Sequence, residues 1–420
     1  MKTDALIGIN FSAAGEFSGQ MLDVDGYQCS LGRLSVVVGG LGGGLRVASS
    51  FGAWEMTVAP SQSVRSSSSS SSNAATPATL YDLALGLPKV VQIRPEMRRK
   101  AERGYGLLGA ATDMPQAVQA GPVTLDPAMT VEAALQRFGQ RCLNHLLCNE
   151  PVALAGEPEG VHQIRVAVRR LRSALSALKP MLPAEHHRWA SEELRWFTRA
   201  LAPMRNWDIF TGDLLRPVRE ALPNRHEIER LVSAAERSRR AAFIDAKQTI
   251  LSQRHTEAML RLLQWFAARA WRDQPISENT ILLLAPISDV APDLIERCHR
   301  KARRRCKRFD ELTPAGRHKL RIAFKKLRYT IEFLESLFDK HEVRAFVKRL
   351  KSLQDHLGHA NDVRVAYDLM DQIRETKTHN AGAIDRAGGL VLGWHERDLV
   401  DREPKLRKHV RHFKQLDPFW

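Results

Sequence analysis

The 420-residue sequence has few of the features that mark membrane, secreted or disulfide-linked proteins. It holds no run of about 18 consecutive apolar residues, so no membrane-spanning helix is expected. Its N-terminus lacks the charged-then-apolar order of a secretion signal. The five cysteines are an odd number and form no Cys-x-x-Cys pair, which favours the reducing cytosol over a disulfide framework. Aromatic residues make up only 7% of the chain, which disfavours a surface that stacks on bases.

Basic residues outnumber acidic residues only in the last two thirds of the chain. The sequence has 63 Lys and Arg against 47 Asp and Glu, a formal net charge of +16. Residues 1–150 hold 12 basic and 12 acidic side chains, whereas residues 151–420 hold 51 and 35, so the whole surplus lies in the second region. All 15 histidines follow residue 144. We therefore expect the second region to meet a negatively charged partner.

Residues 1–79 show no pattern of a compact domain. They are rich in Gly and Ser, and seven consecutive serines at 66–72 are typical of a flexible linker. One strand is expected at Val36–Val38. Residues 80–120 regain order, with a helix from Leu80, strands over 89–94 and 100–108, and a linker from 109. The sequence thus predicts a truncated or poorly ordered, β-containing segment before the main domain.

From about residue 128 the pattern is helical throughout, because apolar residues recur three or four positions apart and strand-like alternation is nearly absent. The expected helices span 131–149, 161–182, 188–201, 225–271, 295–309, 318–338, 343–357 and 363–377. The breaks coincide with Pro180, Pro183, Pro217, Pro223, Pro286, Pro292 and Pro314. The fold class expected for residues 125–415 is all-α, long enough to bury a substantial core.

An internal repeat appears when the chain is shifted by 156 residues. The segment Val161-His-Gln-Ile-Arg-Val-Ala-Val-Arg-Arg-Leu-Arg172 then lies on Arg317-His-Lys-Leu-Arg-Ile-Ala-Phe-Lys-Lys-Leu-Arg328. Without a gap, Leu201-Ala-Pro-Met-Arg-Asn206 lies on Leu357-Gly-His-Ala-Asn-Asp362. This shared register predicts two copies of one helical unit, packed about a pseudo-twofold axis.

Each copy places a row of cations on one side of a helix. At 100° per residue the polar members fall within about 80°, beside a separate apolar face. They are His162, Arg165, Arg169 and Arg172 in the first copy, and His318, Arg321, Lys325 and Arg328 in the second. Arg170 and Lys326 are expected to point elsewhere. A third helix, 295–309, carries a similar row that includes Arg300 and Arg304.

These rows have two interpretations. A single basic row is most often a solvated helix face. However, solvated faces usually mix signs, since like charges three or four residues apart repel. Three such rows together favour an anionic partner, and a spacing of about one helical turn, roughly 5.4 Å, suits a linear polyanion. Arg and Lys both bind phosphate, and His adds a proton-sensitive donor.

At these residues the sequence resembles the CHAD family, the conserved histidine α-helical domain. The resemblance covers roughly residues 125–415 and rests on the two His-x-x-Arg segments from His162 and His318, and on Leu201–Asp208 and Leu357–Asp362. The resemblance implies two four-helix bundles related by a pseudo-twofold axis, with a basic central surface. It also implies binding of inorganic polyphosphate and association with polyphosphate granules. The first copy departs from the family pattern at Ala202 and Asn206, where Gly and an acid are commoner. We expect Asp208 and Asp362 to hold basic side chains in place.

A second, partial resemblance concerns residues 80–105. Leu80-Tyr-Asp-Leu-Ala-Leu-Gly-Leu, Val90-Val-Gln-Ile-Arg-Pro and Arg99-Lys-Ala-Glu-Arg-Gly-Tyr105 look like the end of a CYTH domain. That resemblance implies a metal-dependent inorganic triphosphatase, often fused ahead of CHAD, with Arg94, Lys100 and Glu102 as remnants of its tunnel wall. The family's opening Glu-x-Glu-x-Lys is absent from residues 1–79, and a metal-dependent site needs convergent carboxylates. Either the domain has decayed or the reading frame of this segment has shifted.

The other chemical signals are weak. Glu185-His186-His187 and His356-x-x-His359 lack a carboxylate cluster at ligand spacing, so no metal site is assigned. Cys298 and Cys306 fall on an apolar helix face and are expected in the core. No phosphate-binding loop, nucleophile elbow or His-Glu-x-x-His motif occurs, so no catalytic residue is assigned. The basic run at 237–240 is more typical of a solvated face than of a second site.

Together these observations predict a cytoplasmic protein that binds polyphosphate through the basic rows, without a cofactor. Two alternatives stay open. The CYTH-like part could act as a triphosphatase, and only then is a divalent metal expected. The same basic surface could instead bind nucleic acid. The sequence does not predict an oligomeric state, and no membrane partner is expected.

Overall fold

The structure is a computed structural model that describes residues 6–10, 16–19, 21–22, 34–38, 45–48, 77–89, 92–97, 115–376 and 381–420. These residues form two compact units. One comprises residues 1–119, 143–164 and 248–272, and the other residues 120–142, 165–247 and 273–420. Each unit is described by itself. Among the described residues, no helix combines the length and apolar character needed to cross a membrane.

The first unit contains short strands and a helical pair. Strand β1 (Leu6–Asn10) pairs with β3 (Met21–Leu22) and, in parallel, with β6 (Gln92–Glu96). The second sheet has the order β2 (Glu16–Gly19), β4 (Leu34–Val38), β5 (Leu45–Ala48). Helix α1 (Pro77–Gly86), followed by η1 (Leu87–Lys89), packs on α9 (Gln253–Ala268), and the Thr256 hydroxyl donates to the Ile93 carbonyl at 2.9 Å. The strand expected at Val36–Val38 is part of β4, whereas the one expected over 100–108 lies outside the described residues.

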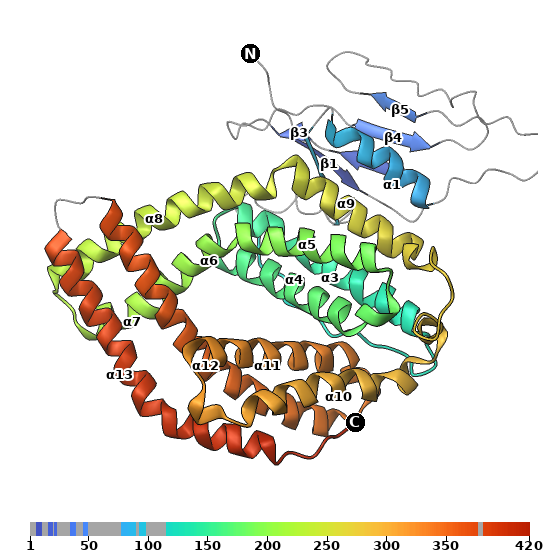
Figure 1. Ribbon diagram of the computed structural model, residues 1–420. Helices are drawn as coiled ribbons and strands as arrows, with labels where there is room; N and C mark the ends of the chain where they lie inside the picture. Colours follow the sequence, from blue (N-terminus) through green and yellow to red (C-terminus); the bar gives the residue numbers. More distant parts are fainter. Residues whose placement is uncertain are drawn as a thin grey trace, which may run out of the picture. The chain divides into compact units, whose positions relative to one another are not determined.

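Two series of helices make up the rest of the chain (Figure 1). The first series is α3 (Val131–Leu154), α4 (Pro158–Ala177), η2 (Lys179–Met181), α5 (Ala184–Ala200), α6 (Ala202–Ile209), η3 (Phe210–Leu215), α7 (Arg216–Ala221) and α8 (His226–Ile250). The second is α10 (Ile287–Cys306), α11 (Pro314–Leu334), η7 (Glu335–Leu337), α12 (Lys340–Glu375) and α13 (Ala381–Lys414). Short turns η4 (Ala270–Arg272), η5 (Ile281–Leu284) and η6 (Phe309–Glu311) lie in the connections. The expected all-α fold of this region is confirmed.

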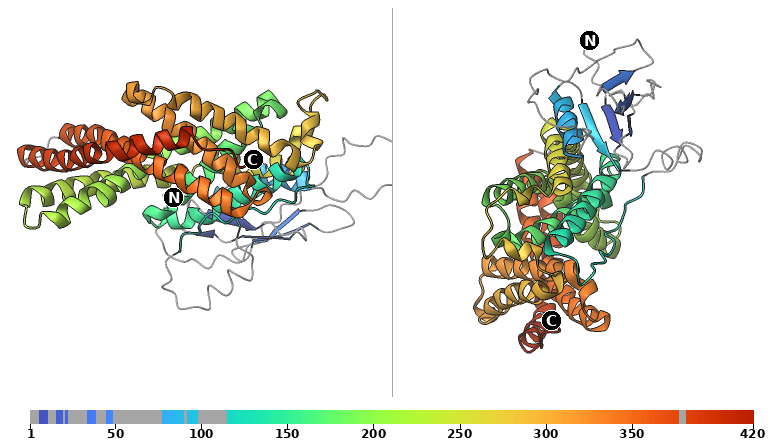
Figure 2. Two further views of the ribbon diagram at one scale, coloured as in Figure 1. Left: turned by 90° about the horizontal axis from the view of Figure 1, so that it is seen from below. Right: turned by 90° about the vertical axis from the view of Figure 1, so that its right-hand side faces the viewer.

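The duplication extends well beyond the motifs that revealed it. The starts of α3 and α10, α4 and α11, η2 and η7, and α5 and α12 are each 156 residues apart. Helix α8 and its counterpart α13 begin at residues 226 and 381, one position from the same shift. The register of the two motifs is therefore the register of two whole four-helix repeats. In the second repeat the helical path of α5, α6 and α7 is replaced by the unbroken α12, which runs alongside α13 (Figure 2).

Some helix boundaries differ from those expected. The helix predicted over 225–271 is two helices, because the Ser252 side chain caps α9 by accepting from the His255 amide at 3.2 Å. Helix α10 begins at Ile287 and contains Pro292, where a break was expected. Ile287, Val290, Ala291 and Leu294 are all buried on one face of this turn, and their packing outweighs the cost of an internal proline, about 3 kcal/mol.

The core of the second unit buries the apolar faces that the sequence predicted for α4 and α11. Val168, Leu171 and Leu175 from α4, and Phe324 and Leu327 from α11, are each at most 1% exposed. The Phe324 ring also packs edge-on against Phe413 of α13, with centroids 4.9 Å apart. Cys306 is buried as expected, and Cys298 is half-buried. Burial of these faces fixes the rotation of both helices, and hence the direction of their cationic rows.

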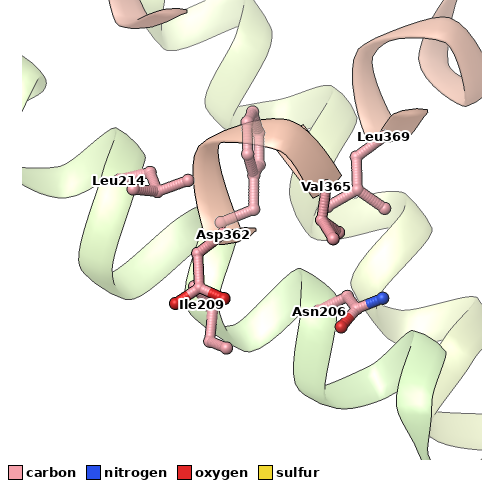
Figure 3. A pocket seen from close by; sticks show the side chains of 7 residues that line it. Asn206, Ile209, Leu214, Asp362, Val365 and Leu369 are labelled. Carbon is pink, nitrogen blue, oxygen red and sulfur yellow. The ribbon is translucent and has the colours of Figure 1, made fainter. Parts of the chain in front are cut away.

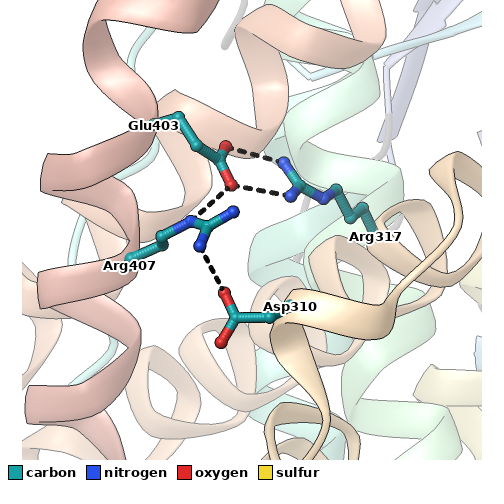
Figure 4. A network of polar contacts seen from close by, with 4 residues as sticks. All are labelled: Asp310, Arg317, Glu403 and Arg407. Atoms are coloured by element: carbon teal, nitrogen blue, oxygen red, sulfur yellow. Dashed lines mark hydrogen bonds and ion pairs between the residues drawn. The ribbon is translucent and has the colours of Figure 1, made fainter.

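A carboxylate on α13 ties together three elements of the second repeat (Figure 4). Glu403 accepts from both terminal nitrogens of Arg317 on α11, at 2.7 and 2.8 Å, and from Nε of Arg407 at 3.2 Å. Arg407 in turn pairs with Asp310 of η6 at 3.2 Å. The Arg317 guanidinium holds the pKa of Glu403 below its ordinary value. Helix α13 is therefore joined to α11 by a charged, bidentate contact.

Replacing Glu403 with Gln should lower the free energy of unfolding by about 1–3 kcal/mol, the cost of a lost charge-assisted hydrogen bond. Because the pKa of Glu403 is lowered in the folded state, its contribution is present above the unfolded pKa and disappears as the pH falls through the folded pKa. Urea unfolding at pH 7 and pH 3 measures this. The difference between the two proteins should be smaller at pH 3 than at pH 7, and an equal difference at both values would contradict the assignment.

Candidate functional site

The cationic rows of α4 and α11 meet in the second unit. Arg165 and Arg169 come from α4, and Arg321 and Lys325 occupy the equivalent positions of α11. Burial, together with the neighbouring cations Arg169, Arg205 and Arg321, lowers the pKa of Arg165 to about 10. Arg321 and Lys325 both lie close enough to Arg169 for its charge to lower their pKa values. We call Arg165, Arg169, Arg205, Arg321 and Lys325 the central cluster.

Several of these side chains are held by the backbone. The Arg165 guanidinium donates to the Thr198 carbonyl of α5 at 2.7 Å, and Nε of Arg169 donates to the Arg165 carbonyl at 3.1 Å. Nε of Arg321 is buried without a hydrogen-bond partner in the described structure, and it lies 3.9 Å from the position that a Cβ on Gly358 would take. A carbonyl satisfies one N–H but supplies no negative charge. The contacts of Arg165 and Arg169 therefore leave their positive charges in place.

Lys325 has the most strongly shifted pKa of the cluster. Burial, together with the charges of Arg169, Arg321 and Arg328, lowers this pKa to about 6, although Asp362 acts in the opposite direction. At neutral pH the amine is therefore mainly neutral in the protein alone. A ligand that brings negative charge would favour its protonated form.

Two carboxylates lie near the central cluster, since the charge of Arg205 acts on both Asp208 and Asp362. Asp362 of α12 interacts with Arg321, Lys325 and Arg205, and burial raises its pKa. It lines a small pocket opposite Asn206 of α6, the residue found 156 positions earlier (Figure 3). Equivalent residues of the two repeats thus meet three times, at Arg165 with Arg321, at Arg169 with Lys325, and at Asn206 with Asp362. Contacts between equivalent positions of the two repeats are expected close to a pseudo-twofold axis that relates them.

A second group of cations lies at the next turns of α4 and α11 and on the neighbouring helices α5 and α10. Burial lowers the pKa of Arg172, and the charges of Arg195 and Arg199 on α5 act in the same direction. Lys326 of α11 donates to the Ser176 hydroxyl of α4 at 3.3 Å, and its pKa is lowered by burial and by Lys301, Arg172 and Arg305. We call Arg172, Arg195, Arg199, Lys301, Arg305 and Lys326 the end cluster. Lys326 was expected to point away from the rows; it does leave the α11 row, but it faces α4.

The other predicted site residues are placed as follows. His162 is half-buried one turn before Arg165 on α4. His318 is exposed and its Nδ1 lies 2.9 Å from Oδ1 of Asn361. Arg328 is paired with Glu332 at 3.5 Å and stacks on Tyr329. Arg300 and Arg304 are exposed on α10, and Arg300 is paired with Glu296 at 3.4 Å. Arg300 and Arg304 lie outside the central cluster, whereas the charge of Arg328 reaches Lys325.

Arg205 is the one member of the central cluster that does not belong to the cationic rows predicted from the sequence. It belongs to the segment Leu201–Asn206 and reaches the cluster from α6, where a helical projection of α4 cannot detect it. Its signal was present, since it lies in the second repeated motif. Asp208 was expected to hold a basic side chain in place, and it accepts from Nε of Arg239 on α8 at 2.8 Å, while the charge of Arg205 also acts on it. Within the described part of the chain, no group of three or more His, Cys, Asp or Glu could hold a metal ion.

Comparison with known proteins agrees with this architecture. The family model of the CHAD domain matches residues 137–371, more than half of the chain. The chain belongs to the CHAD domain family. A crystal structure of the CHAD domain from the plant Ricinus communis shares 26% identity and a TM-score of 0.61, covering 72% of this chain and 98% of that one.

A further solved structure shares the CHAD fold of this chain. PptA from Streptomyces chartreusis is 16% identical with a TM-score of 0.51, covering 69% of this chain and all of that one. A search of curated proteins gave no match. The family model matches residues 137–371, and the CYTH resemblance of residues 80–105 stays a prediction.

Proposed function

We propose that this CHAD protein binds inorganic polyphosphate, with the central cluster as the main binding site. The observation that carries the proposal is the meeting of five basic side chains from both repeats, which outnumber the two carboxylates near them, Asp208 and Asp362. Without a ligand this arrangement is unfavourable, because buried like charges repel and lose hydration. A chain of phosphates supplies closely spaced negative charge and acceptor oxygens for the N–H groups. Association with polyphosphate granules in the cytoplasm follows as part of the same proposal.

The aromatic residues near the cluster favour polyphosphate over nucleic acid. Trp207 lies two residues from Arg205 on α6, and Tyr329 follows Arg328 on α11, but each is only 3% exposed. Neither ring is available to stack on a base, which is how proteins commonly bind single-stranded nucleic acid. The affinity for polyphosphate should therefore exceed that for DNA or RNA at matched phosphate concentration.

The binding of long-chain polyphosphate should weaken steeply with salt, because each neutralised phosphate releases a counterion. If five phosphates are neutralised at about 0.7 counterions each, the affinity should fall roughly 100-fold between 50 and 200 mM salt. Fluorescence anisotropy of labelled polyphosphate measures this, with duplex DNA and RNA as competitors. A flat salt response, or displacement of polyphosphate by equimolar DNA phosphate, would contradict the proposal.

The triphosphatase alternative is tested in the same preparation. If the CYTH-like part were active, the full chain would release phosphate from triphosphate in the presence of magnesium or manganese. In the described part of that region, Arg94 is a half-buried residue of β6, whereas Lys100 and Glu102 lie outside the described residues. We propose binding without hydrolysis, so phosphate release should stay at the rate of the metal alone.

A further inference from the structure

The two ends of the cationic surface are related by the repeat but differ in charge. The surroundings of Arg172 in the first repeat correspond to those of Arg328 in the second. Near Arg172 lie Arg195 and Arg199, and the neighbouring turns hold Ser176 and Lys179. The equivalent positions in the second repeat are Lys351, Asp355, Glu332 and Glu335. Three of the four second-repeat positions are thus acidic, and none of the four first-repeat positions is.

The acids of the second repeat engage their cations. Glu332 pairs with Arg328 at 3.5 Å. Glu335 lies near Glu332, Arg170, Arg344 and Lys351, and burial together with Glu332 raises its pKa. At the first-repeat end, the cations that act on Lys326 are Lys301, Arg172 and Arg305. The end cluster therefore keeps a positive charge that Glu332 and Glu335 partly offset at the second-repeat end.

The chain also covers the second-repeat end. Arg170 is the repeat counterpart of Lys326, yet it is only 6% exposed, donates to the Gly121 carbonyl at 3.4 Å and lies over the Phe138 ring. The same stretch of backbone is fixed by the Leu125 amide, which donates to the Ser336 hydroxyl at 2.9 Å. Lys326, in contrast, is only half-buried, and Lys301, Arg195 and Arg199 are exposed.

We propose that a bound polyphosphate leaves the central cluster on one side only, over the end cluster, and that Glu332, Glu335 and the backbone at 121–125 close the other side. The inference rests on the proposed function and adds the direction in which the bound polyphosphate leaves the central cluster. Phosphates beyond those held by the central cluster lie along Arg172, Lys326, Lys301 and Arg195. Short chains fill the central cluster alone, whereas long chains also occupy the end cluster.

The repeat supplies a matched pair of test variants. Arg195 on α5 and Lys351 on α12 are equivalent, exposed positions, and each substitution by Gln removes one positive charge. Binding of the full-length protein to long-chain polyphosphate and to tripolyphosphate is measured for Arg195→Gln, Lys351→Gln and Lys301→Gln. Arg195→Gln and Lys301→Gln should each weaken long-chain binding about 3- to 10-fold and reduce the salt slope by about 1, without affecting tripolyphosphate. Lys351→Gln should leave both ligands unaffected.

Equal weakening by Arg195→Gln and Lys351→Gln would overturn the one-sided path while leaving polyphosphate binding itself intact. The same conclusion would follow if neither variant changed long-chain binding and the wild type still bound tightly. Failure of the wild-type protein to bind polyphosphate at all would instead overturn the proposed function. Circular dichroism of each variant checks that helicity is retained.

Discussion

Replacing Arg169 with Gln and Lys325 with Met is expected to weaken polyphosphate binding by at least about 100-fold and, at the same time, to make the unliganded protein more stable. The two residues occupy equivalent positions in the repeats, and each lies within the field of the other. A charge-assisted hydrogen bond contributes about 1.5–3 kcal/mol, so loss of two such bonds to phosphate gives a 100-fold effect or more.

The opposite effect on stability follows from burial. Lys325 gives up hydration and approaches three arginines on folding, which is why its pKa falls from 10.5 to about 6. The unfolded chain therefore binds more protons than the folded one between these values, and at neutral pH this difference opposes folding. An apolar side chain of similar length removes that cost. The Tm should rise by about 1 °C for each kcal/mol gained, since a protein of this size has an unfolding entropy of about 0.9 kcal/mol/K.

Differential scanning fluorimetry and anisotropy on the same samples measure both effects. Lys348→Gln, an exposed substitution on α12, is the matched control and should alter neither quantity. Unchanged binding by the double variant would show that the central cluster is not the site. A large fall in Tm would show that the cations stabilise the free protein, contrary to the repulsion inferred from their burial.

The affinity for polyphosphate should also fall as the pH rises above about 6. In the free protein the Lys325 amine loses its proton near this value. A bound phosphate raises the pKa of the amine, so binding takes up a proton at pH values between the free and bound pKa. Affinity then decreases by up to tenfold per pH unit over that interval. The charged groups that face Lys325 are Arg169, Arg321, Arg328 and Asp362.

Isothermal titration calorimetry at pH 7.5 in buffers of different ionisation enthalpy counts the protons taken up. Histidines also titrate near neutral pH, so the comparison between the wild type and Lys325→Met isolates the lysine. The wild type should take up close to one proton more than the variant, whose affinity should depend less on pH. Identical proton uptake by both proteins would exclude Lys325 as the linked group.

The sequence predicted the fold class, the repeat and most of the central cluster because all three depend on local periodicity. A shift of 156 residues aligned the motifs, and the 3.6-residue period separated the apolar faces from the cationic rows. The structure shows that both faces were assigned correctly, since Val168, Leu171, Phe324 and Leu327 are buried. Helix α13 was not predicted, because glycines at 388, 389 and 393 and an internal Pro404 dilute its pattern.

What the sequence could not predict depends on which helices lie opposite each other. On a helical projection of α11, Lys326 lies outside the cationic row. Its amine nevertheless donates to the Ser176 hydroxyl of α4. Arg170 occupies the same position of the other repeat and is instead covered by the backbone at Gly121. Two residues with the same place in the repeat thus have different environments, and no projection of a single helix distinguishes them.

The fusion of the two repeats into one polypeptide has an evolutionary consequence. In a homodimer of a single repeat, every substitution would appear twice, so an acid introduced at one mouth of the binding surface would also appear at the other. In this chain the two residues at equivalent repeat positions can mutate independently. Asn206 and Asp362 differ in this way, as do Lys179 and Glu335. Covalent linkage of the repeats therefore allows the binding surface to have two different ends, although the polyphosphate chain that it binds has two identical ends.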